Sequence, residues 1–287
     1  MAIYQSNEHK PFLYPAVFTL MAVAIIPTIY GIWVSLHEIP QGGSGIMNFV
    51  GLSNYADLFS SSIFWQSVGI TLIFVFFGVF LSLILGFCIA LLLNNFIYGR
   101  QIILTLFILP IVVTPVVSGL VWKFMFDSDI GIINFILGLL GVGKITWLSN
   151  PITALSAIII VETWQWTPFC MFFILAGLQN IPISLYEAGL IDGANRIQIF
   201  SYIIFPQLIP VTAVVILLRI MDSFKAFDTI FVMTQGGPGR ATQVLNMHAY
   251  YIGFRYFNLG EAAAIGIIVL FIIITISQIL LKTFKTT

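Results

Sequence analysis

Six apolar segments, each long enough to cross a lipid bilayer as a helix, account for most of this chain. They cover approximately residues 12–36, 67–93, 102–126, 152–178, 207–233 and 259–282. A helical membrane span needs about 20 predominantly apolar residues, and within a bilayer only helices and closed barrels satisfy every backbone hydrogen-bonding group. We therefore expect an all-α integral membrane protein, in which residues 1–287 form a single domain of six transmembrane helices.

The small number of charged residues excludes several other classes of protein. Charged side chains make up 8% of the chain and apolar ones 60%, whereas soluble domains carry roughly 25% charged residues. The net charge is zero, which argues against a nucleic-acid partner. Cys88 and Cys170 both lie inside apolar segments and predict neither a disulfide framework nor a metal site. The histidines are scattered, so we expect no bound metal.

Three prolines lie inside predicted spans. Pro110 and Pro115 belong to the third span, and Pro168 belongs to the fourth. Proline removes a backbone donor and its ring clashes with the preceding turn. We therefore expect kinks at these positions.

Lysine and arginine in the short loops predict the orientation, because they accumulate on the cytoplasmic side of membranes. The first loop, residues 37–66, contains neither, so we place it outside the cell. Both termini then lie in the cytoplasm, as do Arg100, Arg196 and the whole loop of residues 184–206. Some basic residues remain on the outer side, so the bias is modest.

The loop of residues 184–206 is a polar interruption between two long apolar segments. Ser184 followed three residues later by Glu187 matches a capping box, which predicts a short helix to about Ile191. Asp192-Gly193 predicts the end of that helix, because glycine accepts a positive φ. A second helix over residues 195–205, ending at Pro206, would complete a helix–turn–helix.

The spacing within this loop also carries a family resemblance. Glu187-Ala188-Gly189, then Gly193 after three residues and Ile203-x-Phe205-Pro206 after nine more, resembles the EAA loop of permease subunits of binding-protein-dependent ABC importers, EAA-x3-G-x9-I-x-L-P. Gly189 replaces the second alanine and Phe205 replaces the leucine. Three further stretches are similar to the carbohydrate-uptake branch, which includes maltose and glycerol-phosphate permeases: 49–55, 176–182 and Gly236-Gly237-Pro238-Gly239.

The resemblance implies a transport function that this chain shares with partners. Glu187, Ala188, Gly189, Asp192 and Gly193 would form a coupling element seated in a groove of a cytoplasmic ATPase subunit. The partners would be a second permease of different but similar sequence, two ATPase subunits that carry ATP and Mg²⁺, and an extracellular solute-binding protein. The chain would span the bilayer of the bacterial inner membrane many times, holding no cofactor and catalysing no reaction. A surface loop in which Glu187 only caps a helix is the simpler alternative.

Under this resemblance the solute is a sugar or a related polyol, translocated by alternating access. Which sugar is carried is not encoded in any motif. The family alone implies import rather than export, and it leaves open whether the second permease is another copy of this chain.

Two stretches match known ligand loops only in part. Residues 138–144 fit the G-x-x-x-x-G-K pattern of phosphate-binding loops, but Ile145 occupies the place of the Mg²⁺-binding Ser or Thr. Residues 127–131 begin like a calcium loop but have no glutamate at position 12. We expect a turn after the third span instead, and no nucleotide or calcium site.

Two charges lie deep inside the predicted spans, where each is costly. Glu162 lies about 15 Å from the outer end of the fourth span, and Arg219 about 18 Å from the inner end of the fifth, at 1.5 Å per residue. Both are therefore near the middle of a hydrocarbon core of ~30 Å. We expect them to face the bundle interior and to pair, as part of the translocation path or as an interhelical ion pair.

The fifth span continues this charge pattern. Arg219, Asp222, Lys225 and Asp228 alternate in sign at steps of three, which brings neighbours within reach on a helix. The pattern predicts a charged stripe that either lines a water-filled path or neutralises itself against neighbouring helices. Arg219 and Asp222 are our candidates for the substrate path on this span.

Aromatic and polar side chains share one face of the fourth span. Glu162, Gln165, Trp166 and Phe169 lie on it at helical spacing, and we take them as candidates for the substrate path. Trp164 points about 200° away from Trp166, so one ligand cannot contact both on a regular helix. Ordinary helix packing is the alternative for this face.

A stand-alone secondary transporter or channel for a small polar solute is the rival function. It would need ion-coupling carboxylates and often has inverted repeats. Glu162 is a possible coupling carboxylate, but no internal repeat is evident. The polar loop of residues 184–206 would also have no purpose in such a protein. An enzyme would need a nucleophile–base pair or a set of metal ligands, and the sequence offers neither.

Overall fold

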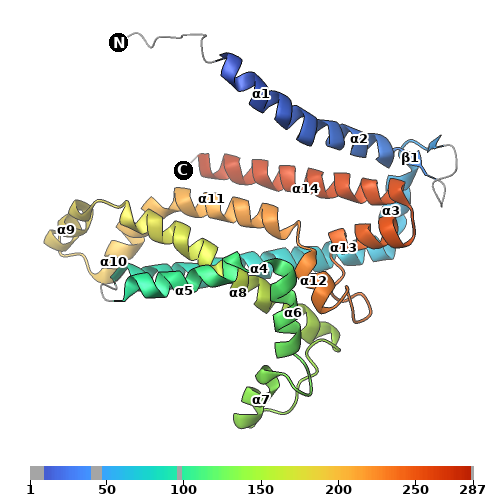
Figure 1. Cartoon of the computed structure of the whole chain (residues 1–287). Coiled ribbons are helices and arrows are strands. Elements are labelled where there is room, and N and C mark those ends of the chain that lie inside the picture. Colours follow the sequence, from blue (N-terminus) through green and yellow to red (C-terminus); the bar gives the residue numbers. More distant parts are fainter. Residues whose placement is uncertain (1–9, 40–46, 96–98, 286–287) are drawn as a thin grey trace. The chain divides into compact units, whose positions relative to one another are not determined.

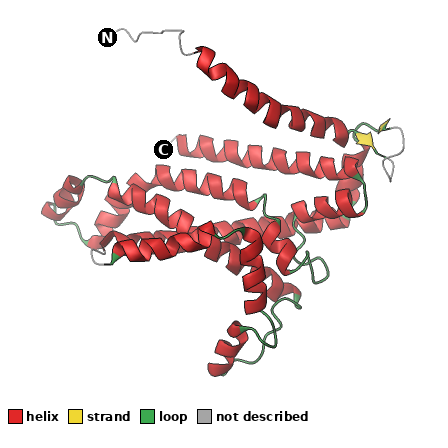
Figure 2. Ribbon diagram, in the orientation of Figure 1, coloured by secondary structure: helices red, strands yellow, loops and turns green. Residues whose placement is uncertain are grey.

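The computed structural model of the chain describes residues 10–39, 47–95 and 99–285. Almost all of these residues are helical (Figure 2). The single small sheet among them pairs β1 (His37–Glu38) with β2 (Asn48–Phe49) in antiparallel register, His37 opposite Phe49. The prediction of an all-α membrane protein is confirmed.

The chain forms two compact units, one of residues 1–64 and 248–270 and the other of residues 65–247 and 271–287. We describe each unit by itself. Whether they act as one domain, as the sequence predicts, stays a prediction.

The first unit contains the first membrane span. Three helical segments form it: α1 (Lys10–Leu20), the π-helix η2 (Met21–Ile25) and α2 (Ile26–Ser35). The short helix α3 (Ser53–Ser60) is tied to the end of this span by Asn54, whose Nδ2 donates to the carbonyls of Ser35 at 2.8 Å and His37 at 3.1 Å. The unit also includes the π-helix η4 (Tyr251–Arg255).

Five helical segments of the described chain are long and apolar enough to span a membrane, and a bent pair of helices makes a sixth candidate. The five are Leu13–Ser35, Ser62–Asn94, Pro151–Gln179, Arg196–Ser223 and Leu259–Thr283. They fall within α1 to α2, α4 (Ser62–Asn95), α8 (Pro151–Gln179), α10 to α11 and α14 (Leu259–Lys285). Each predicted span therefore has a helical counterpart in the structure.

The third predicted span is broken rather than kinked. It divides into α5 (Arg100–Val112) and α6 (Pro115–Met125), whose axes differ by 98° (Figure 1). Pro115 begins α6, and Thr114 before it is extended, as expected for a residue that precedes proline. Pro110 lies inside α5 and does not end that helix.

The fifth predicted span, residues 207–233, is wrong at its C-terminal end. The helix α11 (Phe205–Ser223) stops in a turn, and a separate helix α12 (Asp228–Met233) follows. In this turn the amides of Lys225 and Ala226 donate to carbonyls three residues back. The helix α12 packs on α6, where Gly119 leaves room for Val232. Tertiary packing thus replaces the continuous helix that the apolar pattern predicts, and the charged stripe ends after Asp222.

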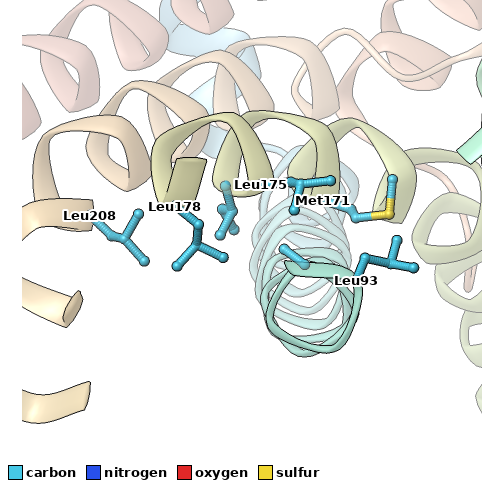
Figure 3. Close-up of a cluster of buried hydrophobic side chains, with 7 residues drawn as sticks. Leu93, Met171, Leu175, Leu178 and Leu208 are labelled. Atoms are coloured by element: carbon cyan, nitrogen blue, oxygen red, sulfur yellow. The ribbon is translucent and has the colours of Figure 1, made fainter. Parts of the chain in front are cut away.

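A buried apolar cluster of the second unit joins α4, α8 and α11 (Figure 3). Its members are Ala90, Leu93, Met171, Ile174, Leu175, Leu178 and Leu208. Two glycines permit the close approach of these helices. A Cβ on Gly86 of α4 would lie 2.6 Å from the Cβ of Cys170, and one on Gly177 would lie 3.0 Å from Leu208.

Candidate functional site

A helix–turn–helix connects the end of α8 to the start of α11. It consists of α9 (Ile183–Ile191), a turn at Asp192-Gly193, and α10 (Arg196–Ile199). Gly193 has a φ of +77°, so the turn uses the left-handed conformation that glycine accepts readily. In Figure 1 both helices lie at the end of α8 and α11 away from α12. The predicted helix and its end at Asp192-Gly193 are confirmed.

The capping of the two helices differs from the prediction. Pro182 is the N-cap of α9 with an extended backbone, so Ser184 lies within the first turn and makes no capping hydrogen bond. Because α9 begins two residues earlier than the capping box predicts, Glu187 is not at the third helical position. The capping box is at the second helix instead, where Asn195 and Gln198 exchange hydrogen bonds of 2.8 and 2.9 Å.

The second helix of the loop does not end at Pro206. The helix α10 continues through the π-helix η3 (Phe200–Ile204) directly into α11. Proline has no N–H to donate, and the wide π turn before it accommodates its ring without a break. The loop is therefore continuous with the fifth membrane span, and a displacement of α10 would act directly on α11.

Gly189 holds the two arms of the helix–turn–helix together. It is buried, and a Cβ at this position would lie 2.9 Å from Cδ1 of Ile203 and 3.4 Å from Cγ1 of Ile199. The departure from the EAA pattern at Gly189 thus coincides with close packing of α9 on η3 and α10. The Tyr186 hydroxyl is buried without a hydrogen-bond partner among the described residues, and this burial raises the pKa of Tyr186.

The remaining residues predicted for the coupling element, Glu187, Ala188, Asp192 and Gly193, lie outside the buried core of the loop. Large apolar side chains of the same helix, α9, are exposed, led by Ile191 (85%), Ile183 (73%) and Leu190 (63%). A loop in contact with water alone would bury such side chains or lack them. The exposed patch is typical of a surface that contacts a partner.

The second constellation is an ion pair between Glu162 on α8 and Arg219 on α11. Arg219 Nη2 lies 2.5 Å from Glu162 Oε1, and both side chains are buried. The predicted pairing of these residues is confirmed. Ser223, one turn after Arg219, donates to the same carboxylate oxygen at 2.9 Å and accepts from Arg219 at 3.0 Å. Ser223 was not among the predicted site residues, although its i+4 spacing on the same helix face is readable from the sequence.

Two further groups surround the arginine. Asp222 Oδ2 accepts from Arg219 Nη1 at 3.1 Å while keeping about half of its side chain exposed. The guanidinium carbon of Arg219 lies 4.5 Å from the ring centre of Trp166, within the range of a cation–π interaction. Trp166 therefore contributes to holding the arginine in place.

A cavity of about 250 Å³ opens beside this network. Its lining comes from α8, from the end of α11 and the turn after it, from the start of α12 and from Pro115. The lining residues are Pro115, Glu162, Gln165, Trp166, Asp222, Lys225, Ala226, Phe227, Asp228 and Thr229. The break between α11 and α12 thus brings Lys225 and Asp228 to the same space as Glu162.

The structure separates the predicted path residues into two groups. Glu162, Gln165, Trp166 and Asp222 line the cavity. Arg219 is buried and is not part of the lining, and Phe169 lies nearly perpendicular to Trp166 with 6.0 Å between the ring centres. Gln165 Nε2 donates to the carbonyl of Val113, at the break between α5 and α6. Trp164 contacts Trp122 instead, so the predicted divergence of the two tryptophans is confirmed. The role of these residues in a substrate path stays a prediction.

The two partial ligand motifs belong to the connection between α6 and α8. Residues 127–131 form the predicted turn. The carboxylate of Asp127 accepts hydrogen bonds from the amides of Ile130 and Asp129, and these bonds lower the pKa of Asp127. The glycine-rich stretch of residues 138–144 begins in the last turn of the short helix α7 (Ile132–Leu139), and Lys144 is paired with Asp129. Within residues 10–39, 47–95 and 99–285, no group of three or more His, Cys, Asp or Glu is placed to hold a metal ion.

Comparison with known proteins identifies the class. Residues 82–285 match the family described as the binding-protein-dependent transport system inner membrane component. The chain is 38% identical over 275 residues to the trehalose/maltose transport system permease protein MalF of Thermococcus litoralis, covering 93% of this chain and 90% of that protein. It is 31% identical over 285 residues to the arabinooligosaccharides transport system permease protein AraP of Bacillus subtilis, covering 98% and 90%.

A solved structure shows the same fold. The crystal structure of a bacterial ABC transporter involved in the import of the acidic polysaccharide alginate superposes with a TM-score of 0.82, at 20% identity, over 96% of this chain and 94% of that one. The chain belongs to the family of inner membrane components of binding-protein-dependent transport systems. It is the permease of an ABC importer, a multi-pass membrane protein that is not itself catalytic.

Proposed function

We propose that this chain is the permease of an importer for a sugar or related polyol, driven by ATP hydrolysis on partner subunits. The exposed apolar helix–turn–helix carries the proposal, because a permease that takes its energy from another protein needs such a surface. Support for a carbohydrate comes from the similarity of this chain to the trehalose/maltose and arabinooligosaccharide permeases. A cavity lined by Trp166, Gln165 and several charged groups suits a hydroxyl-rich solute, because aromatic faces stack on sugar rings and polar groups bind hydroxyls.

The partners follow from the same proposal. Two cytoplasmic ATPase subunits bind ATP and Mg²⁺ and receive α9 and α10 in a groove, so the loop and both termini are cytoplasmic. A second permease of different but similar sequence completes the path, and an extracellular binding protein delivers the solute. The complex lies in the bacterial inner membrane. A bacterial alginate ABC transporter of the same fold has been crystallised in complex with a periplasmic protein that holds an alginate pentasaccharide, which supports the last of these partners.

The coupling would work through helix continuity. The loop joins α8 to α10, and α10 runs without a break into α11. Closure of the ATPase dimer would displace the loop and move α8 and α11 together, since Glu162 and Arg219 tie the two helices. The cavity beside that ion pair would then open to one side of the membrane at a time.

The stand-alone secondary transporter receives less support from the same residues. Its candidate coupling carboxylate, Glu162, is held by Arg219 and by Ser223. An ion-coupling carboxylate must exchange its cation during transport, and a buried arginine is a fixed counter-charge that competes with it. The decisive observation is whether uptake of a labelled oligosaccharide survives collapse of the ion gradient while ATP is maintained.

The coupling proposal predicts a specific effect at Gly193. Replacing it with valine should distort the turn, because a β-branched residue is strained at a φ of +77°. We expect Gly193→Val to reduce both the ATPase that co-purifies in mild detergent and the ATP-dependent uptake, each by roughly tenfold, since a strain of about 1–3 kcal/mol opposes the docked shape. Mass spectrometry of the co-purified proteins measures the first effect.

Gly193→Asn is the matched control, since asparagine tolerates the left-handed conformation. It should retain most of the ATPase. A variant in which bulky apolar residues replace both Glu187 and Gly193 should lose the co-purifying ATPase entirely. Recovery of no ATPase with the unchanged chain, under conditions that preserve a known importer complex, would favour the stand-alone transporter.

A further inference from the structure

The cavity beside Glu162 is lined by more negative than positive side chains. Four of its lining residues are ionisable: the carboxylates of Glu162, Asp222 and Asp228, and the ammonium group of Lys225. The excess is therefore negative. Asp222 keeps 48% of its side chain exposed, and Asp228 is exposed at the start of α12, so both can act on a solute in the cavity.

The nearby arginine does not reverse this sign. Arg219 is 1% exposed and is not part of the lining. Its guanidinium donates to Glu162, Asp222 and Ser223 and lies against the ring of Trp166, so its contacts are made within the protein. Even if the full charge of Arg219 is counted, the three carboxylates outnumber the two cations.

We propose that this cavity selects uncharged carbohydrates and rejects anionic ones, such as uronates and sugar phosphates. This inference deepens the proposed function and rests on it for the carbohydrate class. A cleft lined by an excess of one sign and walled by apolar side chains focuses its field and depletes solutes of the same sign. Rejection here would make the permease a second filter after the binding protein, because repulsion discriminates against a wrong solute even where contacts to the right one are few.

The selection is consistent with the residues that remain for binding. Trp166 offers aromatic surface, and the amide oxygen of Gln165 and the three carboxylates can accept hydrogen bonds from the hydroxyl groups of a neutral sugar. A uronate would place its own carboxylate among these acceptors without a free arginine to pair with it. Lys225 is the single cation of the lining, and it lies between Asp222 and Asp228 in the chain.

Charged thiol reagents test the sign of the cavity directly, without knowledge of the natural sugar. Ala226 lines the cavity and is half-buried, so Ala226→Cys places a small reporter inside it. Ser149 is exposed in the connection before α8, and Ser149→Cys is the reference. Both are made in a chain carrying Cys88→Ala, because Cys88 is exposed whereas Cys170 is fully buried.

The measurement uses vesicles that contain the complete transporter. The rate of reaction is compared for a cationic trimethylammonium methanethiosulfonate and an anionic sulfonate methanethiosulfonate. We expect the cation-to-anion rate ratio at Ala226→Cys to exceed that at Ser149→Cys by about tenfold, the lower end of the range for charge-focusing clefts. Asp222→Asn combined with Asp228→Asn should bring the ratio close to the reference. Equal ratios at the two sites, or no response to the two asparagines, would overturn the inference.

Uptake of oligosaccharides separates this inference from the proposed function. Vesicles should take up a neutral maltooligosaccharide at least about tenfold faster than an oligogalacturonate of equal length. Equal uptake of the two would overturn the selection. A third result would be a negative cavity in the thiol experiment and a transporter that takes up neither compound nor any other neutral sugar. That result would support the electrostatic inference and contradict only the carbohydrate assignment.

Discussion

Replacing Arg219 with methionine is expected to destabilise the permease by about 3–5 kcal/mol, the usual cost of removing one partner from a buried ion pair. The side chain of Glu162 is 9% exposed and would be left without its main counter-charge. Methionine fills a similar volume, so the loss reports the charge rather than a cavity. Unfolding of the detergent-solubilised chain by titration with a denaturing detergent measures the change in free energy.

The control for this prediction removes both charges. Arg219→Met combined with Glu162→Gln should recover more than half of the lost stability, because an uncharged amide is far less costly to bury than a carboxylate. Ser223 can still donate to the amide oxygen. A double variant as unstable as the sum of the two single variants would mean that the two residues do not interact energetically, and the ion pair would not link α8 to α11.

The sequence predicts the membrane spans because their signal is local. Length and apolarity alone place a helix at each of the six segments, and the depth of Glu162 and Arg219 along two of them predicts the observed pair. Depth is readable because the helical rise is constant. It does not give the rotation of each helix, so the cation–π contact of Arg219 with Trp166 comes only from the structure, whereas the i+4 spacing of Ser223 from Arg219 is readable from the sequence.

Breaks in the helices are predicted less well, since they depend on what packs against them. The pattern predicts a kink at Pro115, but the 98° turn there creates a surface on α6 that receives α12. The fifth span then ends at Ser223 rather than near residue 233. Six of the ten lining residues, Pro115 and residues 225–229, lie at these two breaks or at the start of α12, so a continuous fifth span could not predict Asp228 as a neighbour of Glu162.

The capping error has a different origin. Ser184 with Glu187 and Asn195 with Gln198 have the same three-residue spacing, and both fit the sequence pattern of a capping box. Only the second pair forms one. The extended backbone of Pro182 makes it the N-cap, so α9 begins two residues before the predicted start. Gly193 follows the other end of α9, so a shift in the start of the helix does not move the turn, and the prediction of the turn is correct.

Replacing Gly86 with alanine is expected to destabilise the second unit by about 1–3 kcal/mol, the usual range for overpacking. The new Cβ would lie 2.6 Å from the Cβ of Cys170, 2.8 Å from the amide nitrogen of Met171 and 3.0 Å from the carbonyl of Thr167. Two of these atoms are backbone, so no side-chain rotation relieves the clash, and α4 and α8 must separate. The same denaturing-detergent titration measures the loss.

Gly69 provides a control on the same helix with the opposite expected sign. It lies within α4, and a Cβ there would meet no heavy atom within 4 Å. Gly69→Ala should therefore gain up to about 0.5–1 kcal/mol from the higher helix propensity of alanine. Equal effects of the two substitutions would mean that the close approach of α4 to α8 does not contribute to stability. A loss confined to Gly86→Ala, together with slower ATP-dependent uptake, would show that transport depends on the packing of α4 against the helix that carries Glu162.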